Sequence, residues 1–218
     1  MMRAVTDTRP DSRPGLPDSA PTRPRPSTDA ALIERSWREP ERFAEVFDRH
    51  YAPIHGYVAR RLGASVADDV ASETFLVAFD RRRRYDVAQA SARPWLYGIA
   101  ANLVARHRRA ELRRYRALAR ADVPAADDGH GEGVARRVDA ATLRRRLAAA
   151  LVEIAHGDRE VLLLVAWAQL SCEEAARALG IPAGTARSRL HRARRKTRAA
   201  LADADPRSTL EGDERWTT

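Results

Sequence analysis

The sequence predicts an all-α protein: two small helical bundles joined by a flexible linker, the second containing a helix-turn-helix. Two observations support this prediction. Between residues 29 and 201 most segments place apolar residues three or four positions apart, and none shows the alternation with a period of two that is typical of a half-buried strand. Residues 121–138 (ADVPAADDGHGEGVARRV) interrupt this pattern with Gly, Asp and Ala, which indicates a linker.

The domain boundaries follow from the same changes in composition. Residues 1–28 are rich in Pro and poor in large apolar residues, which predicts a disordered N-terminal arm. The first bundle is expected over 29–120, the linker over 121–142 and the second bundle over 143–202, followed by an acidic tail at 203–218.

The first bundle is expected to begin with a short helix and a long one. The short helix starts near Asp29 and ends before Pro40, because the residue that precedes a proline avoids the α conformation. The long helix extends to Gly63, and Pro53 should kink it because proline lacks the amide that a helix interior needs. Its apolar residues recur at helical spacing: Phe43, Val46, Phe47, Tyr51, Ile54, Val58 and Leu62.

Two more helices complete the first bundle. Ser65, three residues before Asp68, predicts a cap for the third helix. The fourth helix opens at Pro94 and is expected to continue into an arginine-rich stretch that includes Arg114. The buried stripe of the third helix is expected to be Ala71, Phe75, Ala78 and Phe79.

The second bundle is expected to start with two helices. Asp158, after a break at His156 and Gly157, is predicted to cap the second of them, which carries a run of Leu and Val. The first is marked by Leu143, Leu147, Leu151 and Ile154.

The last two helices read as a helix-turn-helix. Ser171 and Glu174 form a capping box, and Gly180 supplies the positive φ that a helix end favours. Pro182 then presets the first turn of a second helix, which runs to about Leu201. This is the geometry of a DNA-binding helix-turn-helix.

The final helix has one apolar face and one basic face. At 100° per residue, Ala186, Leu190 and Ala193 point to the core, and no acidic residue occurs between Gly180 and Ala202. A helix that only had to be solvated would intersperse acids, because like charges three or four residues apart repel. The residues expected to reach base edges are Thr185, Arg187, Ser188, His191 and Arg192. Those expected to hold phosphates are Arg194, Arg195, Lys196 and Arg198.

The net charge of +9 is concentrated in the two bundles. Residues 41–120 carry +7 and residues 171–201 carry +6, whereas residues 121–142 and 203–218 carry −3 each. Arginine supplies nearly all of the positive charge, and the guanidinium group matches phosphates and base edges bidentately. Both bundles are therefore expected to bind a polyanion.

Other classes of function are disfavoured. The single cysteine, Cys172, excludes a disulfide scaffold and a four-cysteine zinc site, and we expect it to be a small buried residue. The six histidines show no metal-ligand spacing, and neither a Ser-His-Asp order nor a glycine-rich phosphate loop is readable. We therefore expect no enzyme, no metal and no other cofactor. The absence of a membrane-length apolar run and of a signal peptide predicts a cytoplasmic protein with no membrane insertion.

Three stretches together resemble the extracytoplasmic-function (ECF) subfamily of bacterial RNA polymerase sigma factors. They are ADDVASETFLVAF (67–79), ARPWLYGIAANLVARHRR (92–109) and LSCEEAARALGIPAGTARSRLHRARRK (170–196). The resemblance implies a protein that binds core RNA polymerase, recognises a two-part promoter and helps to open it. The implied partners are core RNA polymerase, promoter DNA and an anti-sigma factor.

The resemblance assigns the third helix of the first bundle to polymerase binding. The positions that match the family's docking helix are Asp68, Asp69, Glu73, Thr74 and Phe75. Asp69 and Glu73 lie four residues apart and share one helix face, as a docking surface requires. The alternative is that these acids only cap and solvate the helix.

The resemblance assigns the minus-ten element to the same bundle and the minus-thirty-five element to the helix-turn-helix. Residues 85–93 match a loop that receives a flipped base, and Trp95 and Asn102 match the following helix. Unpaired bases are held by stacking and by hydrogen bonds to their edges. Core packing is the alternative for Trp95, and residues 81–84, all Arg, fit either phosphate contact or solvent exposure. Backbone contacts are expected from Arg106, Arg108, Arg109, Arg113 and Arg114.

A stand-alone helix-turn-helix transcription regulator that binds duplex DNA without polymerase is the alternative function. Such a regulator would need neither the acidic face of Asp69 and Glu73 nor the base-binding segment. The two functions therefore differ in what they require of the first bundle.

Overall fold

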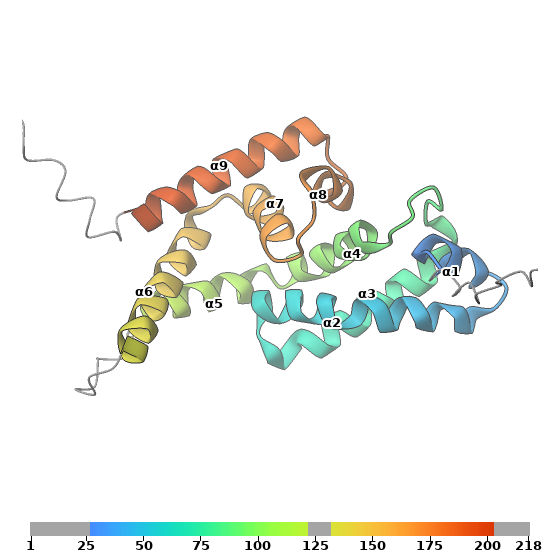
Figure 1. Ribbon diagram of the computed structural model, residues 1–218, viewed down its shortest axis with the longest axis horizontal. Helices are drawn as coiled ribbons and strands as arrows, with labels where there is room; N and C mark the ends of the chain where they lie inside the picture. Colours follow the sequence, from blue (N-terminus) through green and yellow to red (C-terminus); the bar gives the residue numbers. More distant parts are fainter. Residues whose placement is uncertain (1–26, 122–131, 203–218) are drawn as a thin grey trace, which may run out of the picture.

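The computed structural model describes residues 27–121 and 132–202, and every regular element among them is helical (Figure 1). Nearly all of the predicted N-terminal arm, the first part of the predicted linker and the acidic tail lie outside the described residues. None of the described helices is long and apolar enough to cross a membrane.

The first bundle consists of α1 (Asp29–Arg35), α2 (Phe43–Leu62), α3 (Ala67–Arg81), α4 (Arg93–Arg106) and α5 (Arg108–Arg120). The helices α2, α3 and α4 pack on one another, while α1 packs on one end of α2. The predicted apolar stripes form their core, with one exception: Phe47 is 38% exposed. This exception contributes to a surface groove described below.

Two local predictions for this bundle need correction. The helix α3 is not capped by Ser65, which lies in a 3₁₀ turn (Ala64–Val66), and the residue at the N-cap makes no side-chain bond. The fourth helix does not continue into the arginine-rich stretch. It ends at Arg106, the helix is interrupted at His107, and the separate helix α5 begins at Arg108. The long helix α2 runs from Phe43 to Leu62 with Pro53 inside it, as predicted.

The second bundle consists of α6 (Glu132–Glu153), α7 (His156–Ala166), α8 (Cys172–Leu179) and α9 (Ala183–Ala202). The helix α6 begins inside the predicted linker, where good helix formers are present although no apolar period is visible. Because α7 begins at His156, Asp158 lies within its first turn and is not its cap.

The helix-turn-helix forms as predicted. The capping box of Ser171 and Glu174 has both of its hydrogen bonds, and Gly180 is left-handed with φ of 62°. All three residues assigned to the inner face of α9 are buried: Ala186, Leu190 and Ala193.

The two bundles lie against each other. The helix α8 packs on α4 and α6 packs on α5, and buried residues of both bundles belong to one hydrophobic core (Figure 1). The sequence predicted two bundles on a linker and gave no indication of this contact. We call this packing of α8 on α4 the closed arrangement.

Candidate functional site

A pocket of about 210 Å³ lies where the loop after α3 meets the start of α4. We call it the strand pocket. It is lined by Arg84, Tyr85, Asp86, Gln89, Ser91, Pro94, Trp95 and Arg177. The rings of Tyr85 and Trp95 pack with centroids 5.0 Å apart, and Trp95 is half-buried. Trp95 therefore combines core packing with a place in the pocket wall. Aromatic walls with amide and guanidinium groups at the rim can hold an unpaired base.

Asp29 fixes the end of the loop that forms the strand pocket. One of its carboxylate oxygens accepts a hydrogen bond from the amide of Ala92 at 2.9 Å and lies 2.8 Å from Nε2 of His50. Burial alone would raise the pKa of Asp29, but these hydrogen bonds and the positive charges of His50 and Arg49 prevail and lower it. Asp29 thus stays ionised and ties α1 and α2 to the start of α4.

Tyr85 is buried and bridges the same loop through its hydroxyl. Its hydroxyl donates a hydrogen bond to the carbonyl of Gln89. Burial, together with the negative charges of Asp29 and Asp86, raises the pKa of Tyr85 to about 12, while Arg177 opposes the rise. The phenol therefore remains protonated and keeps its donor role.

The arginines around the strand pocket divide into structural and accessible groups. Arg82 donates to the carbonyls of Ser36 and Phe79, and its guanidinium lies 3.8 Å from the centroid of the Phe79 ring. Arg84 instead lines the pocket. The run of four arginines at 81–84 therefore includes one residue that bonds the fold and one that is placed to meet a ligand. All five predicted backbone contacts are exposed: Arg106, Arg108, Arg109, Arg113 and Arg114.

The predicted docking residues on α3 are not equally accessible. Asp68 and Asp69 are exposed, whereas Thr74 and Phe75 are buried and face the core. Glu73 is half-buried and forms an ion pair with Arg106 at 3.0 Å, which links α3 to the end of α4. Of the predicted docking residues, only the acids can touch a partner. Thr74 and Phe75 pack in the core and hold the helix in place.

An apolar groove of about 410 Å³ adjoins these acids. Its lining is Pro40, Glu41, Phe43, Ala44, Phe47, Ser72, Phe75, Leu76 and Phe79. Leu76 is 67% exposed and lies on the same face of α3 as Asp69 and Glu73. Sequence reasoning missed Phe47 and Leu76 as surface residues. Leu76 could have been noticed, because it is a large apolar residue on an otherwise polar helix face.

The helix α9 presents a basic groove of about 470 Å³. It is lined by Cys172, Arg187, Leu190, His191, Arg194, Arg195 and Arg198. The helix packs against α7 and α8, with Val161, Ala176 and Ala186 in the contact between the three helices. A helix with exposed arginines on one face and small residues on the other can enter a major groove.

Three predicted DNA-contacting residues of α9 have partners within the second bundle. Arg192 donates two hydrogen bonds to Asp158 of α7, at 2.8 and 2.9 Å. Lys196 donates to the carbonyl of Glu153 at 3.1 Å, and Ser188 is exposed and donates to the carbonyl of Thr185 at 3.0 Å. Arg192 and Lys196 therefore fasten α9 to α7 and α6, which the sequence could not indicate.

Among the side chains that the structure describes, no three His, Cys, Asp or Glu residues come together as metal ligands. The polar side chains gather instead at the strand pocket, the face of α3 beside the apolar groove and the basic groove.

Comparisons with known proteins match both bundles to one family. Residues 46–114 match the model of sigma-70 region 2, and residues 144–197 match that of sigma-70 region 4. The ECF RNA polymerase sigma factor SigC of Mycobacterium tuberculosis is 38% identical over 152 residues, covering 69% of this chain and 76% of SigC. The RNA polymerase sigma factor CarQ of Myxococcus xanthus is 31% identical over 176 residues, covering 75% of this chain and 91% of CarQ.

Solved structures are similar over most of the chain. The structure of CnrH in complex with the cytosolic domain of CnrY matches with a TM-score of 0.57 and 25% identity, over 81% of this chain and 98% of CnrH. The sigma factor RpoE of Bartonella quintana, solved with the anti-sigma factor NepR, matches in fold, with a TM-score of 0.50 and 18% identity. It covers 74% of this chain and 98% of RpoE.

Proposed function

Since this chain belongs to the ECF group of sigma-70 RNA polymerase sigma factors, we propose that it docks on core RNA polymerase through α3 and reads a two-part promoter with one site on each bundle. The observation that carries this proposal is the pairing of the strand pocket on the first bundle with the basic groove on the second. A stand-alone regulator is not favoured, because the first bundle matches region 2 as well. The chain itself performs no chemistry, and it acts in the cytoplasm with the polymerase.

The strand pocket receives an unpaired base of the minus-ten element. The wall of Tyr85 and Trp95 offers a stacking surface, and Arg84 lies at the pocket to meet a phosphate or a base edge. Asn102 is exposed on α4 further along the same face and continues the path of the strand.

The basic groove of α9 binds the minus-thirty-five element in the major groove. Arg187 and His191 lie nearer the start of the helix and contact base edges, whereas Arg195 and Arg198 contact phosphates. Arg192 and Lys196 act mainly as positioning residues, because their partners lie on α7 and α6.

Polymerase docks on the apolar groove and the acids beside it. An exposed apolar patch rimmed by acids suits a partner helix that has both apolar and basic residues. CnrH was solved with the cytosolic domain of another protein, CnrY, which supports regulation of this chain by a protein partner as well. We propose an anti-sigma factor for that role.

Co-elution with core polymerase tests the docking surface. Asp69→Arg combined with Leu76→Ser is expected to weaken binding to core polymerase by at least about tenfold, because both side chains are exposed at the groove. Asp139→Arg, an equal charge reversal at an exposed site on α6, is the control and should bind like the wild type. Unchanged affinity in the double variant would reject the docking surface.

Initiation tests the function as a whole. The wild-type chain added to core polymerase is expected to give transcripts with defined start sites. A chain that fails to co-elute with core polymerase but binds duplex DNA tightly would instead be a stand-alone regulator.

A further inference from the structure

The strand pocket takes its shape largely from one loop, residues 82–92 between α3 and α4, which we call the pocket loop. Five of the eight residues that line the pocket belong to it. Among the described residues, the hydrogen bonds of 85–89 stay within the loop, as between the Tyr85 hydroxyl and the Gln89 carbonyl. The course of the loop therefore depends on how its two ends are held.

The first end of the pocket loop is fastened to the two residues that follow α1. The indole N–H of Trp37 donates to the carbonyl of Arg82 at 3.2 Å, and the Arg82 guanidinium donates to the carbonyl of Ser36 at 3.3 Å. Arg83 donates to the carbonyl of Trp37, also at 3.3 Å. These bonds join segments of the chain that lie 45 and 46 positions apart.

The second end of the pocket loop is fastened to the first residues of α1. The amide of Ala92 donates to the Asp29 carboxylate at 2.9 Å, and the amide of Ala30 donates to the carbonyl of Ala90 at 3.4 Å. The other oxygen of Asp29 accepts from Arg49 of α2 at 3.4 Å. The two ends of α1 thus hold the two ends of the pocket loop.

Packing and capping of α1 do not account for the contact between Asp29 and the loop. Leu32 and Ile33 supply the buried apolar contacts of this helix. Thr28 already caps it by accepting from the amide of Ala31 at 3.2 Å. Asp29 is nevertheless only 7% exposed, and burying a carboxylate is costly unless its partners require it there. Those partners include the end of the pocket loop.

We propose that α1 presets the pocket loop for an unpaired base, with Asp29 and Trp37 as the positioning residues. Neither residue lines the strand pocket, so both act through the loop. The match to sigma-70 region 2 begins at residue 46, so α1 lies outside the matched part of the chain.

The benefit of a preset loop is energetic. A loop that is already held in its binding conformation loses less conformational freedom when a base enters. More of the free energy of base binding is then left to offset the cost of unpairing and unstacking that base. This inference rests on the proposed function of the strand pocket.

Hydrogen–deuterium exchange of the full chain without polymerase tests whether α1 holds the loop. Asp29→Ala removes the acceptor of the Ala92 amide, and Trp37→Phe removes the donor to Arg82 while it keeps an aromatic ring. Glu34→Ala removes an exposed acid from the same helix and is the matched control.

The peptide that covers residues 85–93 is expected to exchange at least about tenfold faster in Asp29→Ala and in Trp37→Phe, because each loses a hydrogen bond that restrains the loop. Peptides from α9, and every peptide of Glu34→Ala, should exchange as in the wild type. Far-UV circular dichroism checks that each variant is folded. Unchanged exchange over 85–93 in either folded loop variant would overturn the proposal.

Transcription by the holoenzyme tests whether the preset loop serves promoter opening. On a promoter mapped from wild-type start sites, Asp29→Ala is expected to form open complexes at least about tenfold more slowly. On the same promoter with mismatched bases across the minus-ten element, it should stay within about twofold of the wild type, because the bases are already unpaired. Equal losses on both templates, or weaker binding to core polymerase, would make Asp29 a structural support of the whole bundle and reject the proposal.

The two experiments separate this inference from the proposed function. A wild-type chain that never initiates with core polymerase would reject the proposed function. The exchange measurement contains no polymerase and no DNA, so it decides by itself whether α1 holds the pocket loop.

Discussion

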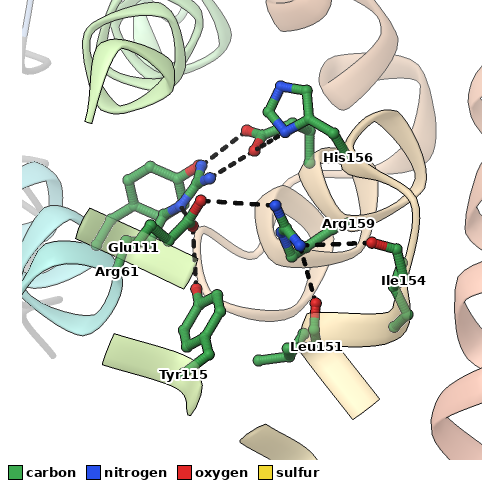
Figure 2. Close-up of polar contacts among 9 residues, drawn as sticks. Arg61, Glu111, Tyr115, Leu151, Ile154, His156 and Arg159 are labelled. Atoms are coloured by element: carbon green, nitrogen blue, oxygen red, sulfur yellow. Dashed lines mark hydrogen bonds and ion pairs between the residues drawn. The ribbon is translucent and has the colours of Figure 1, made fainter. Parts of the chain in front are cut away.

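Glu160→Gln removes one charge from the buried charge network that joins the two bundles, which consists of Arg61, Glu111, Arg159 and Glu160 (Figure 2). The substitution keeps the shape of the side chain. In the closed arrangement both oxygens of the Glu160 carboxylate accept from Arg61, and the side chain is 7% exposed. Glutamine offers one acceptor, and its amide group places a donor against the second guanidinium nitrogen. The junction then holds an uncompensated positive charge.

The cost of this change can be worked from the geometry. Removing one partner of a buried ion pair costs about 3–5 kcal/mol. Arg61 keeps Glu111 at 2.6 Å, so we take about 3 kcal/mol, the lower end of that range. Because separation of the bundles returns Arg61 to water, this cost acts on the closed-to-open ratio and shifts it about 10²-fold. A wild-type chain that is about 1% open would become about half open.

Urea denaturation followed by far-UV circular dichroism measures this shift. While the bundles are coupled they unfold together in one transition, and once uncoupled each unfolds at its own midpoint. Glu160→Gln is expected to show two transitions. Glu153→Gln, the same change at an exposed position of α6, should behave like the wild type. A single transition at the wild-type midpoint in Glu160→Gln would refute the reasoning.

Two further predictions concern the DNA-binding residues and the strand pocket. Arg187→Ala is expected to change preference among promoter sequences by about 1–3 kcal/mol at one position. Arg198→Ala should weaken binding to all duplexes alike and lower the slope of log affinity against log salt concentration by about one. Equal, sequence-independent losses for both variants in a duplex binding titration would contradict the division into a base-contacting and a phosphate-contacting residue. Asp29→Ala is expected to lower the melting temperature at pH 7. Because the fold lowers the pKa of Asp29 from its ordinary value of 3.8, its contribution is complete above that pH and is lost as the pH falls through the lower folded value. Thermal melts should therefore show the gap to the wild type closing below about pH 4, and a gap independent of pH would contradict the role of the ionised carboxylate.

Most of the fold could be predicted because helix periodicity and helix ends are local properties. The capping box of Ser171 and the positive φ of Gly180 need only their neighbours in sequence. The failures occur where several local solutions compete. A 3₁₀ turn replaces the cap that Ser65 could have made, and α6 extends to Glu132, in a stretch whose composition favours helix although its apolar pattern does not.

The candidate sites could be predicted only in part, because exposure and pairing are tertiary properties. The sequence located the base-binding segment and the basic helix, but it could not show that Thr74 is buried or that Arg192 is paired with Asp158. The charge network was missed because its partners lie 50 and 99 residues apart in the chain. One signal was available: Arg61 continues the stripe of Ile54 and Tyr57 at helical spacing, where a solvated residue does not belong.

The proposed docking groove and the helix packing between the two bundles lie on different helices of the first bundle. The groove is formed by α2 and α3, and it stays open in the closed arrangement, with Phe47 38% and Leu76 67% exposed. The helix α8 packs on α4 instead, at Gly98, while Asn102 further along α4 stays exposed. The groove proposed for polymerase is therefore accessible before the two bundles separate.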